Sequence, residues 1–155
     1  MLESLAFTPI SQVVRSPMML VSPETSIAVV VARMRDEHKS AVGVVDGFGR
    51  LMGLFSERDA LMRLGHAAPV LGARAVGTLM ARDVISLRAT DSIRKALFLM
   101  QARDFRHLPI VDADGLPTAI VALRDILCYV ADFFPREVMN LPPEPRLEAY
   151  ALSGG

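Results

Sequence analysis

The chain repeats itself at a spacing of 66 residues. Asp46-Gly47-Phe48-Gly49 matches Asp112-Ala113-Asp114-Gly115, and 112 minus 46 is 66. Arg58-Asp59 matches Arg124-Asp125 at the same offset, and no gap is needed from about residue 10 to residue 64. Such a period indicates that one supersecondary unit occurs twice. An element predicted in one copy must therefore also suit the other.

The repeat decides whether residues 27–34 form a helix or a strand. The β-branched run within them would by itself suit a strand. In residues 27–34 and 93–100, however, apolar side chains recur at intervals of three and four, which predicts helices. Thr25 or Ser26, and Asp91 or Ser92, are suitable N-caps.

The remaining elements follow the same period. Strands are expected at 19–21, 41–45 and 51–55, and at 85–87, 107–111 and 117–121. Glycine-containing turns at 46–50 and 112–116 suit hairpins. Short helices are expected at 10–14 and 76–80, and second helices near Ser56 and Ala122. The fold class is α/β (α+β). Its two β-α-β-β-α units are expected to pack sheet to sheet about a pseudo-twofold axis, because one small sheet buries little alone.

The period also divides the chain. A first unit is expected over 8–66, a linker with Pro69 and Gly72 over 67–75, and a second unit over 76–134. The prolines of residues 135–155 disfavour regular structure, which predicts an extended C-terminal tail.

Composition excludes several classes of protein. Among 155 residues, Lys plus Arg and Asp plus Glu number 17 each, so the basic excess of a nucleic-acid-binding protein is absent. The single cysteine, Cys128, cannot form an internal disulfide and is expected to be a buried thiol. No apolar run is long enough to span a membrane, and no signal peptide is recognisable. A cytoplasmic protein without a membrane partner is expected.

Short motifs in both copies resemble those of the CBS domain. They are Val44 to Gly49 and Gly53 to Asp59 in the first copy, and Arg106 to Gly115 in the second. The resemblance covers about residues 8–132. It implies a pair of CBS domains, known as a Bateman module, with two clefts between the repeats. Such clefts often bind AMP, ADP, ATP, S-adenosylmethionine or related adenosyl compounds.

The resemblance also implies which residues form the first cleft. By position these are Ser56, Arg58, Asp59, Val84, Ile85, Arg106, His107 and Pro109. In the family the aspartate binds the ribose hydroxyls and the preceding hydroxyl helps to hold phosphate. The residue chemistry agrees, because a helix start attracts phosphate and arginine donates charge-assisted bonds. The alternative reading of Ser56 and Asp59 is a purely structural capping box.

The second cleft is expected to be weaker. By position it contains Met19, Leu20, Ser40, Ala41, Gly43, Arg124 and Asp125. Ala122 stands where the first copy has the hydroxyl of Ser56, which favours a structural role for Asp125. This cleft could take a nucleoside without phosphates, or serve only in packing.

The leading function hypothesis is a regulatory module that senses an adenine nucleotide and acts on another protein. The alternative is a dimerisation scaffold with no physiological ligand. A homodimer is expected in either case, through apolar helices at 27–34 and 126–129. No nucleophile–base pair, Walker A loop or Gly-x-Gly-x-x-Gly motif is present, so no enzyme activity is expected. No metal site or required cofactor is predicted, and the sequence leaves open whether Mg²⁺ accompanies a bound nucleotide.

Overall fold

The computed structural model describes residues 5–14, 16–64 and 68–133. The predicted tail at 135–155 lies outside these residues. Each repeat contains helices, strands and a short 3-10 turn, in an order that matches the sequence prediction. The first contains η1 (Ile10–Gln12), β1 (Leu20–Val21), α2 (Ile27–Asp36), β2 (Ala41–Val45), β3 (Leu51–Ser56) and α3 (Glu57–Leu64). After α4 (Ala68–Leu71) the second contains η3 (Val76–Thr78), α5 (Ile93–Arg103), β4 (His107–Val111), β5 (Pro117–Ala122) and α6 (Leu123–Ala131).

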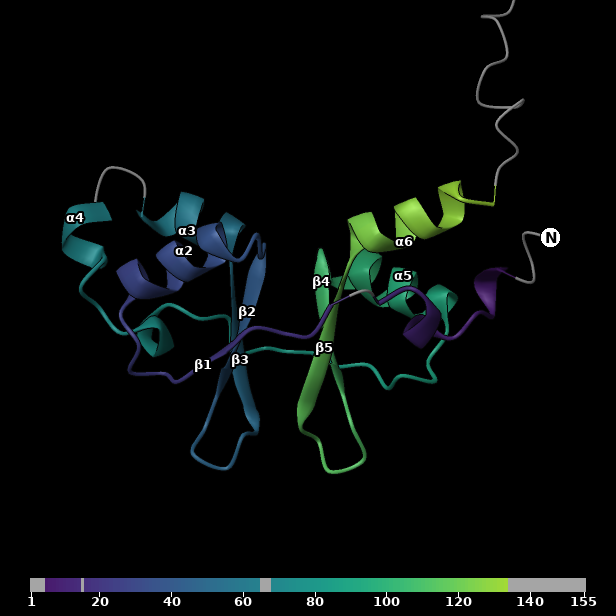
Figure 1. Ribbon diagram of the computed structural model, residues 1–155, viewed down its shortest axis with the longest axis horizontal. Helices are drawn as coiled ribbons and strands as arrows, with labels where there is room; N and C mark the ends of the chain where they lie inside the picture. The colour runs from purple at the N-terminus through teal and green to yellow at the C-terminus, as the bar shows by residue number, and fades with distance from the viewer. Residues whose placement is uncertain (1–4, 15, 65–67, 134–155) are drawn as a thin grey trace, which may run out of the picture.

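The two sheets face each other at the centre of the molecule, and the helices cover their outer flanks (Figure 1). In the first sheet the strand order is β1-β2-β3, with β1 parallel and β3 antiparallel to β2. The second sheet pairs β4 with β5 antiparallel. Both hairpins carry a register shift near the end of their first strand, at Val44/Val45 and at Ile110/Val111. The predicted packing of two pseudo-equivalent units sheet to sheet is confirmed.

The predicted strand at residues 85–87 is reduced to one parallel bridge, between Leu87 and Ile110. Its counterpart β1 is anchored by the N–H of Gly43, which donates to the carbonyl of Met19 at 2.8 Å. Pro109 occupies the position of Gly43 in the second repeat and has no N–H to donate. The second sheet therefore loses the hydrogen bond that would begin its third strand.

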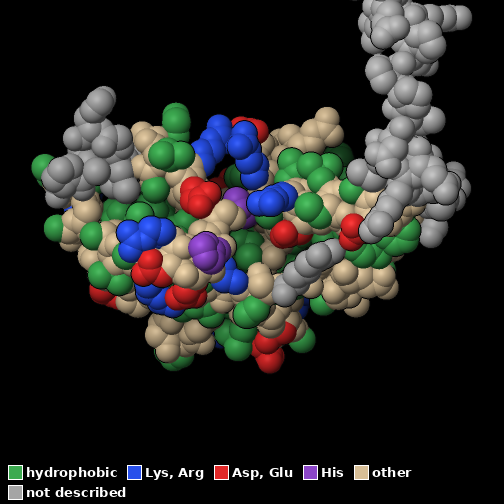
Figure 2. Space-filling view, turned by 45° about the horizontal axis from the view of Figure 1, so that its top comes forward, with side chains coloured by type: hydrophobic (Ala, Val, Ile, Leu, Met, Phe, Trp, Pro, Cys, Tyr) green, Lys and Arg blue, Asp and Glu red, His purple; other side chains and the backbone are tan. Residues whose placement is uncertain are grey.

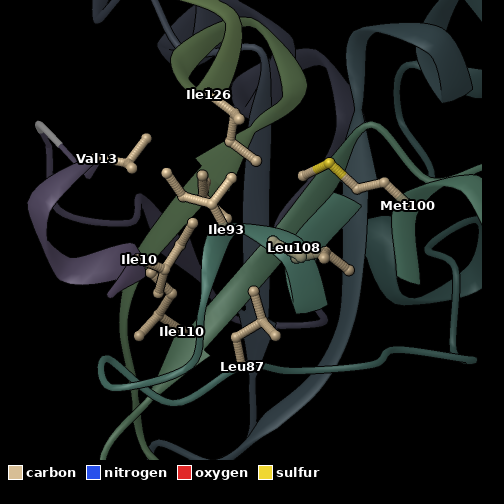
Figure 3. Close-up of a cluster of buried hydrophobic side chains, with 10 residues drawn as sticks. Ile10, Val13, Leu87, Ile93, Met100, Leu108, Ile110 and Ile126 are labelled. Carbon is tan, nitrogen blue, oxygen red and sulfur yellow. The ribbon is translucent and has the colours of Figure 1, made fainter. Parts of the chain in front are cut away.

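The segment that precedes each repeat packs on the other repeat. Ile10 and Val13 lie in the core of the second repeat, where Figure 3 shows them beside Ile93, Ile110 and Ile126. Reciprocally, Val76 and Met80 belong to the core of the first repeat, which is built around Ile27, Val30, Val42, Val44 and Phe55. These apolar side chains leave water only when both repeats are present, which couples the two units.

The backbone hydrogen bonds of this exchange obey the same symmetry. The N–H of Ile10 donates to the carbonyl of Asp91 at 2.7 Å, and the N–H of Val76 donates to Thr25 at 2.8 Å. Both members of the second pair lie 66 residues from those of the first. The predicted short helices are thus single 3-10 turns, which are held by the opposite repeat.

The hairpin turns have the geometry that their sequences predict. Gly49 and Gly115 have φ values of 79° and 82°, a region that glycine enters without steric cost. Asp46 Oδ1 accepts from the backbone N–H groups of Phe48 and Arg50, both at 2.9 Å. Asp112 accepts two equivalent bonds. These aspartates fix the turns, as expected from their position.

The helices also begin as predicted. Ser26 caps α2 by accepting from the N–H of Val29, and Ser92 caps α5 by accepting from the N–H of Lys95. One expectation about α6 is wrong, since Cys128 is exposed and not buried. The apolar stripe of α6 turns Ile126 inward, and Cys128 lies two positions away from it on the helix. None of the described helices is both long and apolar enough to cross a bilayer.

Candidate functional site

Each cleft is built around the junction where the last strand of a repeat enters its last helix. In the first repeat Ala41 of β2 lies opposite Ser56 at the end of β3. The N–H of Glu57 donates to the carbonyl of Ser40 at 3.0 Å, which ties the start of α3 to the segment before β2. In the second repeat, Leu123 donates in the same way to Arg106 at 2.9 Å.

The half-buried carboxylate of Asp59 caps α3. Its Oδ2 accepts from the backbone N–H of Ser56 at 2.9 Å and from the hydroxyl of Ser56 at 2.7 Å. The Ser56 hydroxyl in turn accepts from the N–H of Asp59 at 3.3 Å. The structural capping box is therefore present. Asp59 Oδ1 has no hydrogen-bond donor among the described residues and remains available to a ligand.

The first cleft joins residues from both repeats. Its walls include five residues expected there, namely Ser56, Arg58, Asp59, Arg106 and His107, together with Ala41, Leu54 and Asp104. The cavity has a volume of about 110 Å³. Pockets for drug-sized ligands have volumes of about 300–1,000 Å³. An adenosyl ligand would therefore require this cleft to widen.

An ion pair crosses the first cleft. Arg58 of α3 donates from its guanidinium to the carboxylate of Asp104 at 3.2 Å. Asp104 ends α5 with a φ of 53°, a left-handed conformation that aspartate tolerates better than most residues. Because both side chains are more than half exposed, the pair is weak and a ligand can displace it.

Three residues expected in the first cleft do not line it. Ile85 packs against the core of the second repeat. Pro109 is buried in β4, and Val84 is half-buried but lies outside the cavity wall. The missing third strand explains part of this difference, because residues 85–87 do not run alongside β4 as β1 runs alongside β2.

The second cleft is larger, with a volume of about 900 Å³. Four residues expected there line it, namely Ser40, Ala41, Arg124 and Asp125. Met19 and Gly43 are buried, and Leu20 lies outside the wall. The structure adds polar side chains from both repeats that the sequence prediction missed: His38, Lys39, Glu57, Arg106 and His107. Comparison at the 66-residue offset could have found His38, since it is the counterpart of Asp104.

Asp125 repeats half of the capping arrangement. Its Oδ2 accepts from the backbone N–H of Ala122 at 2.9 Å, while Ala122 has no hydroxyl to complete the box. Asp125 Oδ1 has no hydrogen-bond donor within the part of the chain that the structure describes. Both clefts therefore contain an aspartate with one carboxylate oxygen free.

A hydrogen bond joins the repeats where the two clefts meet. Ser40 Oγ and His107 Nε2 lie 2.7 Å apart, and His107 lines both cavities. Burial lowers the pKa of His107 below its usual value, an effect that nearby Asp125, Glu57 and Asp59 oppose and Arg106 reinforces. Figure 2 shows histidine, acidic and basic side chains gathered around the hollow on this face of the molecule.

Comparison with known proteins identifies the repeat. The sequence profile of the CBS domain matches residues 10–66 and again residues 76–132. CBS domain-containing protein YhcV of Bacillus subtilis is 33% identical over 106 residues, which cover 68% of this chain and 74% of YhcV. Inosine-5'-monophosphate dehydrogenase of Methanocaldococcus jannaschii is 30% identical over 116 residues. These cover 75% of this chain but only 22% of that enzyme.

Solved structures share the fold. The CBS domain pair of protein MJ0100, in complex with 5'-methylthioadenosine and S-adenosyl-L-methionine, superposes with a TM-score of 0.71 at 18% identity, covering 81% of this chain and 98% of that one. CBSX2 in complex with AMP gives 0.67 at 23% identity, covering 80% and 96%. The two sequence matches and the paired architecture together show that this chain belongs to the CBS domain family, as a tandem pair.

Proposed function

We propose that this CBS pair binds adenosine-type ligands between its repeats and passes their occupancy to another protein. The observation that carries the proposal is the pair of aspartates, Asp59 and Asp125, each with one carboxylate oxygen free in a cleft. A carboxylate oxygen accepts hydrogen bonds from vicinal ribose hydroxyls.

The cleft walls also suit the rest of such a ligand. Arg58 and Arg106 line the first cleft, while Arg106 and Arg124 line the second, so each offers guanidinium donors to phosphate oxygens. Both clefts draw these groups from the two repeats. A ligand that contacts both repeats would favour one relative arrangement of them, which a partner protein could recognise.

Similar proteins support this proposal. The MJ0100 pair and CBSX2 were solved with adenosyl compounds. A similar segment also occurs within a larger enzyme, inosine-5'-monophosphate dehydrogenase. The regulated partner of this chain is therefore proposed to be a separate or attached protein that responds to the state of the pair.

Thermal unfolding with and without adenosine, AMP, ADP, ATP and S-adenosylmethionine tests the proposal. A ligand at a hundred times its Kd should stabilise the fold by about 2.7 kcal/mol, which raises Tm by roughly 5–10 °C in a chain of this size. Asp59→Ala and Asp125→Ala should each remove the shift of the ligand held in their own cleft.

Each variant is compared with its own unliganded Tm, because both substitutions also remove a helix cap. The double variant should lose every shift. If no compound raises Tm at millimolar concentration, or if the double variant keeps the full shift, the binding function is wrong.

A second candidate function is a dimerisation scaffold. Leu61 on α3 and its counterpart Leu127 on α6 are 78% and 60% exposed, and Met62 is 78% exposed. Exposed apolar groups of this kind on equivalent helices favour association with a second copy. The proposed homodimer would bury them.

Analytical ultracentrifugation of Leu61→Asp/Leu127→Asp tests this interface. The wild-type chain should sediment as a dimer of the 16.9 kDa protein, and the double variant as a monomer. Phe48→Ser, at an exposed hairpin position away from α3 and α6, is the control that should remain dimeric. A monomeric wild-type protein would disprove the dimer and leave ligand binding unaffected.

A further inference from the structure

The residue that faces the conserved-position arginine differs in charge between the two clefts. In the first cleft Arg58 pairs with Asp104 at 3.2 Å. Moving both positions by 66 residues gives Arg124 and His38, which both line the second cleft. Asp104 and His38 share the same left-handed backbone, each with a φ of 53°. The local geometry is thus retained while the charge changes.

This exchange leaves the two arginines in different states. The carboxylate of Asp104 occupies the guanidinium of Arg58 and would repel a phosphate chain that approached it. Arg124 has no ion-pair partner among the described residues, so its donors remain free. In the second cleft Lys39 adds another cation, at the position that the apolar Phe105 occupies in the second repeat.

The cavities differ in the same direction. The walls of the first cleft carry two arginines and two carboxylates, within about 110 Å³. Those of the second carry Lys39, Arg106 and Arg124 against two carboxylates, within about 900 Å³. The larger volume lies within the range of small-molecule pockets, and the excess of positive charge attracts anions.

We infer that the two clefts sort adenosyl ligands by charge: the second takes a nucleoside polyphosphate, and the first excludes it through Asp104 and takes an uncharged or cationic adenosyl compound. This inference rests on the proposed function and reverses the sequence-based expectation that the second cleft would lack phosphate. Asp104 and His38 are the residues that determine the specificity.

Isothermal titration with ATP and with adenosine tests the sorting. The wild-type chain should bind one ATP, and Asp125→Ala should abolish that binding. Asp104→Asn frees Arg58 and suits the left-handed backbone, so it should raise the stoichiometry to two ATP per chain. His38→Asp should weaken ATP binding at least about fivefold without changing the affinity for adenosine.

Two variants in the remote hairpin turn control for net charge. Asp114→Asn and Ala113→Asp change the charge by the same amounts at exposed positions and should leave both affinities unchanged. Two equivalent ATP sites in the wild-type chain, or an unaltered Kd in His38→Asp, would overturn the sorting while adenosyl binding stands. Failure of both adenosine and ATP to bind any variant would overturn the sorting and the proposed function together.

Discussion

The two repeats share a backbone plan but differ where they face the clefts. Ser56 corresponds to Ala122, Gly53 to Ala119, and Ala41 to His107. Buried positions, by contrast, remain apolar in both copies, as in the pairs Ile27 and Ile93 or Val30 and Ala96. The core specifies the fold through apolar periodicity alone, so the positions around the clefts are free to diverge. A symmetric fold thereby yields two chemically distinct sites.

The largest effect is expected at Gly53, where the repeats cannot be exchanged. A Cβ atom at this position would lie 2.6 Å from Met80 Sδ and 2.7 Å from the backbone oxygen of Ala81. Overpacking of this kind costs about 1–3 kcal/mol. Gly53→Ala should therefore lower Tm by several degrees, and calorimetry measures the loss.

Ala119→Gly, the reciprocal change, is the matched control. It creates no clash and should cost only about 0.5–1 kcal/mol through the entropy of the unfolded chain. If Gly53→Ala were as stable as the wild type, the close packing of β3 against the segment that contains Ala81 would be disproved.

A smaller effect is expected from the helix caps. Ser56→Ala removes the hydroxyl that accepts from the N–H of Asp59, and so gives α3 the incomplete cap of α6. The expected loss is about 1 kcal/mol of unfolding free energy, and Ala122→Ser should stabilise by a similar amount or less. Urea unfolding of the two single variants measures both changes. Equal stability of the Ser56→Ala and wild-type chains would show that the cap contributes nothing.

The smallest effect concerns the pH dependence contributed by His107. Because burial lowers its pKa in the folded state, the unfolded chain, with the ordinary value of 6.5, takes up the proton first. This group therefore leaves stability unchanged at higher pH, where both states are neutral, and reduces stability as the pH falls below about 6.5. The charged neighbours Asp125, Glu57, Asp59 and Arg106 only modify that direction.

His107→Ala copies Ala41 of the first repeat and should flatten the slope between pH 7.5 and 5.5 in urea unfolding. Ser40→Ala removes the 2.7 Å hydrogen bond but keeps the buried ring, so its slope should remain. A slope that persists in His107→Ala would assign the effect to another group.

Much of the fold was predictable because each repeat corrects the interpretation of the other. Residues 27–31 are ambiguous until Ile93 to Met100 fixes the helical spacing, and β2 and β4 have the predicted bounds. The strand at 85–87 was not predictable from periodicity, since its loss depends on an N–H that Pro109 lacks. The exposure of Cys128 was missed because an apolar neighbourhood in sequence does not reveal which helix face is buried.

The sites were less predictable than the fold. Asp59 and Asp125 line their clefts because the strand–helix junction is a local motif. The contact of Arg58 with Asp104 spans 46 residues and depends on how the repeats pack, which no local pattern encodes. His38 and Lys39 were missed for the same reason.

The exchange of Ile10 and Val76 between the cores has a consequence for how the chain acquires its structure. A single repeat produced alone would keep its own sheet and helices but lack the apolar plug that the other repeat supplies. Its hydrophobic cavity could be filled only by the leading segment of a second molecule, which is three-dimensional domain swapping. The tandem chain places both plugs on one polypeptide, so the closure becomes intramolecular and independent of protein concentration.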